Sequence, residues 1–87
     1  MASIRTWKQS NRIEINEVEF DGGANAFEVT FRGKPVVTMH ADTPGQSKDM
    51  RASLDDGEDV RDWVDADGIS VGTLLFYAMS PYSMGDE

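Results

Sequence analysis

Carboxylates are the side chains of this sequence with the clearest chemical potential, and many of them lie in one short stretch. Between residues 55 and 67 there are seven acids and a single base, Arg61. The seven acids are Asp55, Asp56, Glu58, Asp59, Asp62, Asp65 and Asp67. A surface of this charge repels nucleic acid and anionic membranes and attracts basic protein surfaces. We therefore take these seven residues as candidate partner-binding residues.

The second half of the chain accounts for the whole net charge of −8. Residues 1–40 contain five bases and five acids, whereas residues 41–87 contain three bases and eleven acids. This acidity has two interpretations: a binding site, or a general bias of the source. Asp exceeds Glu and Arg exceeds Lys, which is also expected from a halophilic or GC-rich source. Under the second interpretation the acidity serves solubility. The local clustering favours a binding site.

A serine motif gives little support to catalysis. Residues 68–72 match the pattern G-x-S-x-G, which presents a nucleophilic serine in hydrolases. The single histidine, His40, precedes Ser70, and there is no cysteine, so no positioned base or alternative nucleophile is evident. We predict that Ser70 caps a helix and that the protein is not an enzyme.

Metal binding is also weakly supported. Residues 65–68 resemble part of a calcium loop, but Trp63 and Leu74 occupy the positions where its first and last acids are needed. A weak cation site built from Asp62, Asp65 and Asp67 is the alternative to a solvated turn. We predict no metal and no cofactor.

The elements that position these residues begin with strands. Phe27, Val29 and Phe31 alternate with polar residues, which predicts one arm of a half-buried hairpin, and a strand over 36–41 follows. Apolar alternation also marks residues 13–20, but its parity changes near Asn16 and Glu17, which predicts a β-bulge. A short strand over 4–8 is expected to precede it.

The register of the second hairpin decides the environment of His40. A two-residue loop at Gly33 and Lys34 pairs Phe27 with His40 and places the histidine on the phenylalanine face. A three-residue loop pairs Phe27 with Met39 and turns His40 outward. The apolar pattern permits either register.

Beyond a polar Pro-Gly break over 41–47, the hydrophobic period becomes helical. Val60, Trp63 and Val64 predict a buried helix face between an N-cap at Asp56 and a stop at Gly68. The opposite face would carry Glu58, Asp62 and Asp65, about 6 and 4.5 Å apart along the axis. That spacing is similar to the spacing of phosphates on a nucleic-acid strand.

The last apolar segment, 70–79, favours a helix, with a buried strand as the alternative. In a helix Phe76 and Tyr77 lie off the apolar stripe, with Tyr82 and Met84 beyond it. Exposed aromatic residues commonly anchor interfaces, so Phe76 and Tyr77 join the candidate partner-binding residues. Association between copies of the chain is left open.

We therefore predict one α+β domain over 1–87: a three- or four-stranded antiparallel β-meander followed by two helices packed on one face. Residues 1–41 form strands, 48–79 are mainly helical and 80–87 form a tail. The leading hypothesis is a cytoplasmic, acidic interaction module that inhibits a partner by mimicking nucleic acid on its basic surface. By analogy of size and charge alone, phage-encoded inhibitors of host nucleases or CRISPR complexes work in this way, and no motif in this sequence identifies one. The alternative is a structural or assembly protein of a halophile or virus.

Overall fold

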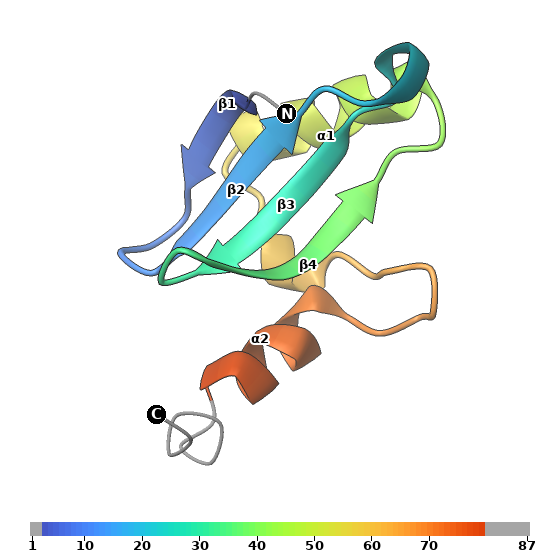
Figure 1. Cartoon of the computed structure of the whole chain (residues 1–87). Coiled ribbons are helices and arrows are strands. Elements are labelled where there is room, and N and C mark those ends of the chain that lie inside the picture. The colour runs from blue at the N-terminus through green and yellow to red at the C-terminus, as the bar shows by residue number, and fades with distance from the viewer. Residues whose placement is uncertain (1–2, 80–87) are drawn as a thin grey trace.

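The computed structural model describes residues 3–79 as an antiparallel sheet followed by two helices (Figure 1). The strands are β1 (Ser3–Lys8), β2 (Ile13–Val18), β3 (Ala26–Phe31) and β4 (Lys34–His40). The helices are α1 (Pro44–Asp55) and α2 (Val71–Met79), and the short 3-10 turns are η1 (Asp21–Gly23) and η2 (Val60–Asp62). This order confirms the predicted α+β meander. The expected tail, with Tyr82 and Met84, lies outside the described residues.

The four strands lie side by side in chain order, each antiparallel to the next. Ile15 lies opposite Val29, and Glu17 lies opposite Phe27, so these side chains share one face of the sheet. The pairing of β2 with β3 runs without a shift, and the shift in the pairing with β1 places the extra residue in β1, between Ser3 and Arg5, so the predicted extra residue in β2 near Asn16 and Glu17 is wrong. The parity change arises because a charged residue, Glu17, occupies a fully buried position.

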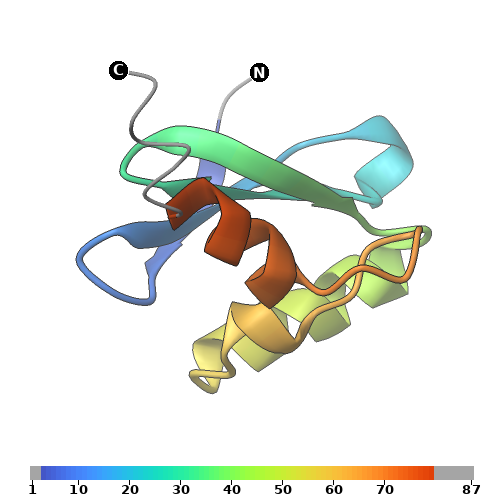
Figure 2. The same cartoon turned by 90° about the horizontal axis from the view of Figure 1, so that it is seen from below.

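Both helices cover the same face of the sheet (Figure 2). The hydrophobic core lies between the two layers and contains Ile15, Phe27, Val29, Phe31, Leu54, Val60, Val71 and Leu75. Trp7 from β1 and Trp63 after η2 both pack on Phe27, each with ring centroids 6.1 Å from it. The part of the chain that the structure describes contains no helix with the length and apolar character needed to cross a membrane.

The β3–β4 hairpin decides the position of His40. It turns at Arg32 and Gly33, whose φ angles are 53° and 82°, as in a type I′ turn. A shift of register in β4 then places Phe27 opposite Met39 and leaves His40 exposed on the other face. The outward orientation of His40 is one of the two predicted alternatives, but it arises from a bulge and not from a three-residue loop.

Helix α1 begins inside the segment that the sequence pattern marks as a break, so that prediction is wrong. The Thr43 hydroxyl oxygen accepts a hydrogen bond from the N–H of Gln46 at 3.0 Å, and Pro44 occupies the first turn. A capping Thr followed by Pro is typical of a helix start. The Pro-Gly pair therefore begins a helix here.

Helix α2 confirms the prediction for residues 70–79. Val71 and Leu75 are fully buried, and the N–H of Thr73 donates to the Ser70 hydroxyl oxygen at 3.2 Å. Ser70 is therefore the predicted helix cap. Gly72 permits α2 to approach η2 closely, because a Cβ at Gly72 would lie 3.1 Å from the carbonyl oxygen of Arg61.

Candidate functional site

The segment 56–67, called the acidic segment below, joins α1 to α2 without forming the predicted helix. Only η2, a single 3-10 turn, is helical within it, and Val64 pairs with Ser70 in an isolated bridge. Val60 is buried as predicted, Trp63 is half-buried, and Val64 is 54% exposed. The predicted row of carboxylates with phosphate-like spacing therefore depends on a helix that is not present.

Aspartates of the acidic segment bond to nearby backbone groups, which explains why the helix does not form. Asp59 caps η2 by accepting from the N–H of Arg61 at 2.9 Å. One oxygen of Asp65 accepts from the N–H groups of Asp67 and Ile69, at 3.0 and 2.9 Å. Such local bonds compete with helical hydrogen bonding. Asp59 and Asp65 thus fix the path of the acidic segment.

Arg61, the single base of the acidic segment, is paired within it. Its guanidinium donates to the Asp59 carboxylate, with a closest distance of 2.6 Å. This hydrogen bond holds the pKa of Asp59 below its ordinary value. Arg61 and Asp59 stay exposed as a pair, and Asp62 lies close enough to add to the raised pKa of Arg61 without forming an ion pair with it.

Asp55, at the end of α1, ties that helix to β1. Its carboxylate accepts from the Trp7 indole N–H at 2.9 Å and from Arg5 at 2.6 Å. The Trp7 bond, followed by the Arg5 bond, lowers the pKa of Asp55. Asp55 therefore has a structural role that the sequence pattern did not reveal.

The four other acids of this group are free to meet a partner. Their side chains are exposed and make no hydrogen bond or ion pair with any residue of the described chain. They are Asp56, Glu58, Asp62 and Asp67. The structure thus divides the seven predicted acids into four free carboxylates and three that organise the fold.

Gln9, in the β1–β2 turn, holds the acidic segment against the sheet. Its side-chain amide donates to the carbonyl oxygen of Glu58 at 2.5 Å, and its oxygen accepts from the N–H of Val60 at 2.9 Å. A cavity of about 460 Å³ lies beside this contact and is lined in part by Trp7 and Leu54. The free carboxylates are consequently attached to a fixed backbone.

Sequence analysis missed a second group of charged residues, which lies between the sheet and α1. The fully buried carboxylate of Glu17 accepts from the guanidinium of Arg51, with a closest distance of 2.5 Å, and from the Asn25 amide at 2.8 Å. The Ser47 hydroxyl oxygen accepts from the backbone N–H of Asn25 at 2.7 Å. The Arg51 hydrogen bond is the main cause of the lowered pKa of Glu17.

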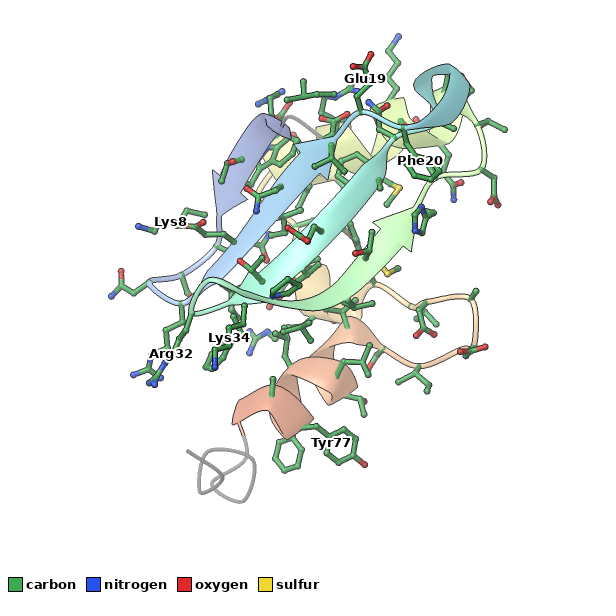
Figure 3. All side chains as sticks on the ribbon, in the orientation of Figure 1. Lys8, Glu19, Phe20, Arg32, Lys34 and Tyr77 are labelled. Atoms are coloured by element: carbon green, nitrogen blue, oxygen red, sulfur yellow. The ribbon has the colours of Figure 1, made fainter. Side chains whose placement is uncertain are left out.

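Several bases outside these ion pairs lie around two hairpin turns, where Figure 3 labels Lys8, Arg32 and Lys34. The N–H of Arg32 donates to the carbonyl oxygen of Arg12 at 2.8 Å, so the two turns are neighbours. None of these four bases forms an ion pair within residues 3–79. The molecule therefore carries both a basic end and an acidic segment.

Phe76 and Tyr77 lie off the buried stripe of α2, as predicted. They are 65% and 62% exposed, and their rings form a T-shaped pair with centroids 6.0 Å apart. Figure 3 shows Tyr77 on the side of α2 that faces away from the sheet. These aromatic residues are therefore exposed, whereas their part in binding stays a prediction.

Ser70 and His40 have separate partners. The Ser70 hydroxyl lies 2.9 Å from the Thr73 hydroxyl, and the His40 ring packs on Phe20 with centroids 5.1 Å apart. No hydrogen bond joins Ser70 to His40 in the described chain. Within residues 3–79, no three carboxylate or imidazole groups gather as a metal site would require.

Comparison of the chain with protein-family models, with curated proteins and with solved structures found no match.

Proposed function

We propose that this chain is a small acidic interaction module that inhibits a partner protein by occluding a basic surface. The observation that carries the proposal is the presence of four exposed carboxylates, with no base of the described chain paired to them. They are Asp56, Glu58, Asp62 and Asp67. A partner with Lys or Arg side chains would supply the counter-charges.

The backbone that presents these carboxylates supports a binding role. The side chains of Gln9, Asp59 and Asp65 make eight hydrogen bonds to main-chain groups or to Arg61 that fix the acidic segment. A surface that is already ordered loses little conformational entropy on binding. The carboxylates therefore need only side-chain ordering to meet a partner.

Nucleic-acid-binding proteins are the partner class that we propose, because their phosphate-binding surfaces are basic. The module would compete with nucleic acid through negative charge presented on loops. The helical spacing considered from sequence is no part of this proposal. Phe76 and Tyr77 would contribute aromatic contact area next to the charged contacts.

Affinity capture with the immobilised full chain tests the proposal. We expect a basic protein to be retained at low salt and released at about 1 M salt, where charges are screened beyond about 3 Å. Added nucleic acid should compete with the immobilised chain for this protein. A triple variant of the acidic segment, D56N/E58Q/D62N, should retain much less of it.

A matched variant controls for net charge. E14Q/E19Q/D49N removes three acids outside the acidic segment, so both triple variants change the net charge from −8 by the same three units. If the two variants lose the partner equally, overall acidity and not the acidic segment governs binding. That result would favour the alternative, in which acidity serves solubility.

A further inference from the structure

Strand β4 forms an edge of the sheet, and part of its backbone is unpaired. In the described chain β3 is the only strand that pairs with β4, and α2 contacts β4 without pairing as a strand. The N–H of Ala41 donates to the carbonyl oxygen of Asn25 at 3.0 Å, and bonding toward the partner strand alternates along an antiparallel pair. Met39 therefore bonds to β3, whereas the N–H and C=O groups of Thr38 and His40 point away from the sheet.

The first half of the same edge is protected against strand pairing. Lys34 lies opposite Phe31 across the turn, so the next residue, Pro35, faces the free edge and has no N–H to donate. The shift of register then interrupts the strand before Val37. Proline, lysine and bulges are the usual protections of edge strands. Thr38 and His40 lie beyond all three.

A hollow flanks this unprotected half on the helix-covered side. Its volume is about 300 Å³, and both Thr38 and His40 contribute to its wall. Met50 and the half-exposed Val64 make part of its lining apolar, and Asp42 and Asp65 add carboxylates. We call it the inner hollow.

A second hollow lies on the open side of the sheet and shares Thr38 and His40 with the first. Its volume is about 390 Å³, and Val18, Phe20 and Glu28 complete its lining. Phe20, labelled in Figure 3, is 45% exposed and packs edge-on against His40. We call it the outer hollow.

We infer that the Thr38–His40 edge of β4 binds an extended basic segment of the partner protein as a fifth strand. The inference rests on the proposed function, from which it takes the premise that the partner is basic. Successive side chains of a strand alternate between its two faces, so an added strand would place them in the inner and outer hollows in turn. Lysine or arginine fits beside Asp42, Asp65 and Glu28.

At the opposite edge of the sheet, Asp55 and Asp59 are already paired with arginines. By the same alternation, the N–H of Gln9 bonds to Ile13, so Thr6 and Lys8 present their backbone groups outward along β1. Lys8 protects that edge, and the cavity beside it is lined by Lys8 and by the paired Arg61 and Asp59. A basic segment would meet the Lys8 cation there, and the one carboxylate of the lining is already paired, which makes β1 an internal control.

Amide hydrogen exchange of the full chain, measured by NMR, tests the inference directly. The probe is a capped ten-residue peptide of alternating Lys and Val, and the control peptide has the same sequence with N-methyl groups on alternate residues. We expect the probe to slow exchange of the Thr38 and His40 amides at least about tenfold, since roughly 1.4 kcal/mol is a factor of ten. Exchange of the Thr6 and Lys8 amides should be unchanged. N-methyl groups on alternate residues block one edge of the peptide, so the control peptide should give no protection by pairing through that edge.

A pair of variants separates the backbone donor from the side chain. T38P removes the outward N–H, whereas T38A keeps it. We expect T38P to bind the probe about tenfold more weakly than T38A, because proline lacks the N–H donor and its ring also hinders pairing. If T38P does not fold, amide hydrogen exchange of the wild-type chain with and without the probe still decides the test.

Unprotected Thr38 and His40 amides in the presence of bound probe would overturn the inference and leave the proposed function standing. Protection that rises with protein concentration in the absence of probe would overturn the choice of occupant, since a second copy of the chain would then pair with β4. If edge protection persists while D56N/E58Q/D62N captures the basic partner as well as wild type, only the proposed role of the acidic segment fails.

Discussion

Carboxylates serve two different purposes in the two charged regions of this molecule. Glu17 is fully buried, paired with Arg51 and bonded to Asn25, whereas Asp56, Glu58 and the other free acids of the acidic segment are exposed and unpaired. A buried charge is tolerated only when partners replace its hydration. The comparison shows that the carboxylate of the first region is paired inside the fold, whereas four carboxylates of the second region are exposed and unpaired, as the proposed recognition role requires.

The largest expected effect is the loss of the buried pair. We expect Glu17→Ala to lower the free energy of unfolding by about 2 to 4 kcal/mol, because it leaves Arg51 and Asn25 without their acceptor. We expect a smaller loss than the roughly 3 to 5 kcal/mol typical of fully buried pairs, because the Arg51 side chain is 33% exposed to water. Urea unfolding followed by tryptophan fluorescence measures the change.

A double variant sharpens this result. Glu17→Leu with Arg51→Met removes both charges together, and a buried pair can often be replaced by apolar residues at little cost. We expect the double variant to be more stable than Glu17→Ala, with the unpaired Asn25 amide accounting for the residual loss. A double variant as unstable as the single one would mean that packing, and not the charge pair, dominates at this site.

Acid should affect the buried region through Glu17. Its pKa lies below the ordinary value of 4.5, so its contribution to stability is complete above about pH 4.5 and disappears as pH falls through the lower, folded-state pKa. Thermal unfolding temperatures measured from pH 7 downward should therefore fall below pH 4.5. Glu17→Gln should have a lower melting temperature at pH 7 and a weaker dependence on acid.

Within the acidic segment, bonded and free aspartates should respond differently. Asp65→Ala should cost about 1 kcal/mol, because the N–H groups of Asp67 and Ile69 lose their acceptor, as at a helix cap. Asp62→Ala should change stability by less than about 0.5 kcal/mol, as exposed substitutions usually do. Equal effects of the two substitutions in chemical unfolding would break the distinction between structural and free carboxylates.

The smallest stability effect is expected for D56N/E58Q/D62N. Its carboxylates have no partners in the described chain, and their removal lowers repulsion in a molecule of net charge −8. We expect equal or slightly higher stability than wild type by urea unfolding. A loss above about 1 kcal/mol, well outside the range for exposed substitutions, would indicate contacts that contradict their assignment as free.

The meander, the last helix and the Ser70 cap could be predicted because their signals are local. Alternation along 27–31, apolar periodicity along 71–78 and a serine before a helical run each follow from backbone geometry. The exposed pair on α2 followed from the same periodicity. Predicting these elements therefore required no knowledge of contacts between residues distant in the sequence.

The two strand and helix errors have different physical causes. Glu17 interrupts the apolar alternation of β2 and read alone indicates a bulge, because its partners Arg51 and Asn25 lie outside β2. Only the pairing of Glu17 with Arg51, 34 residues away, explains its burial. At the start of α1 the Pro-Gly pair indicates a loop, although Thr43 followed by Pro44 is a local signal for a helix start.

The prediction of a helix over the acidic segment was wrong for a different reason. Its apolar spacing is helical, but Asp59 and Asp65 use their side chains to bond nearby N–H groups, and Gly57 leaves the helical region with φ of 83°. Aspartate and glycine favour turns at these positions. Which acids are free and which are bonded therefore depended on backbone geometry that composition does not specify.

The most direct test of the recognition role is the affinity of the captured partner for two variants of equal net charge. Isothermal titration should give a dissociation constant about tenfold higher for D56N/E58Q/D62N than for wild type, because three exposed ion pairs of roughly 0.5 kcal/mol each sum to about a factor of ten. E14Q/E19Q/D49N should differ from wild type by less than about threefold. Equal affinities of the two variants would contradict the assignment of the acidic segment as the recognition surface.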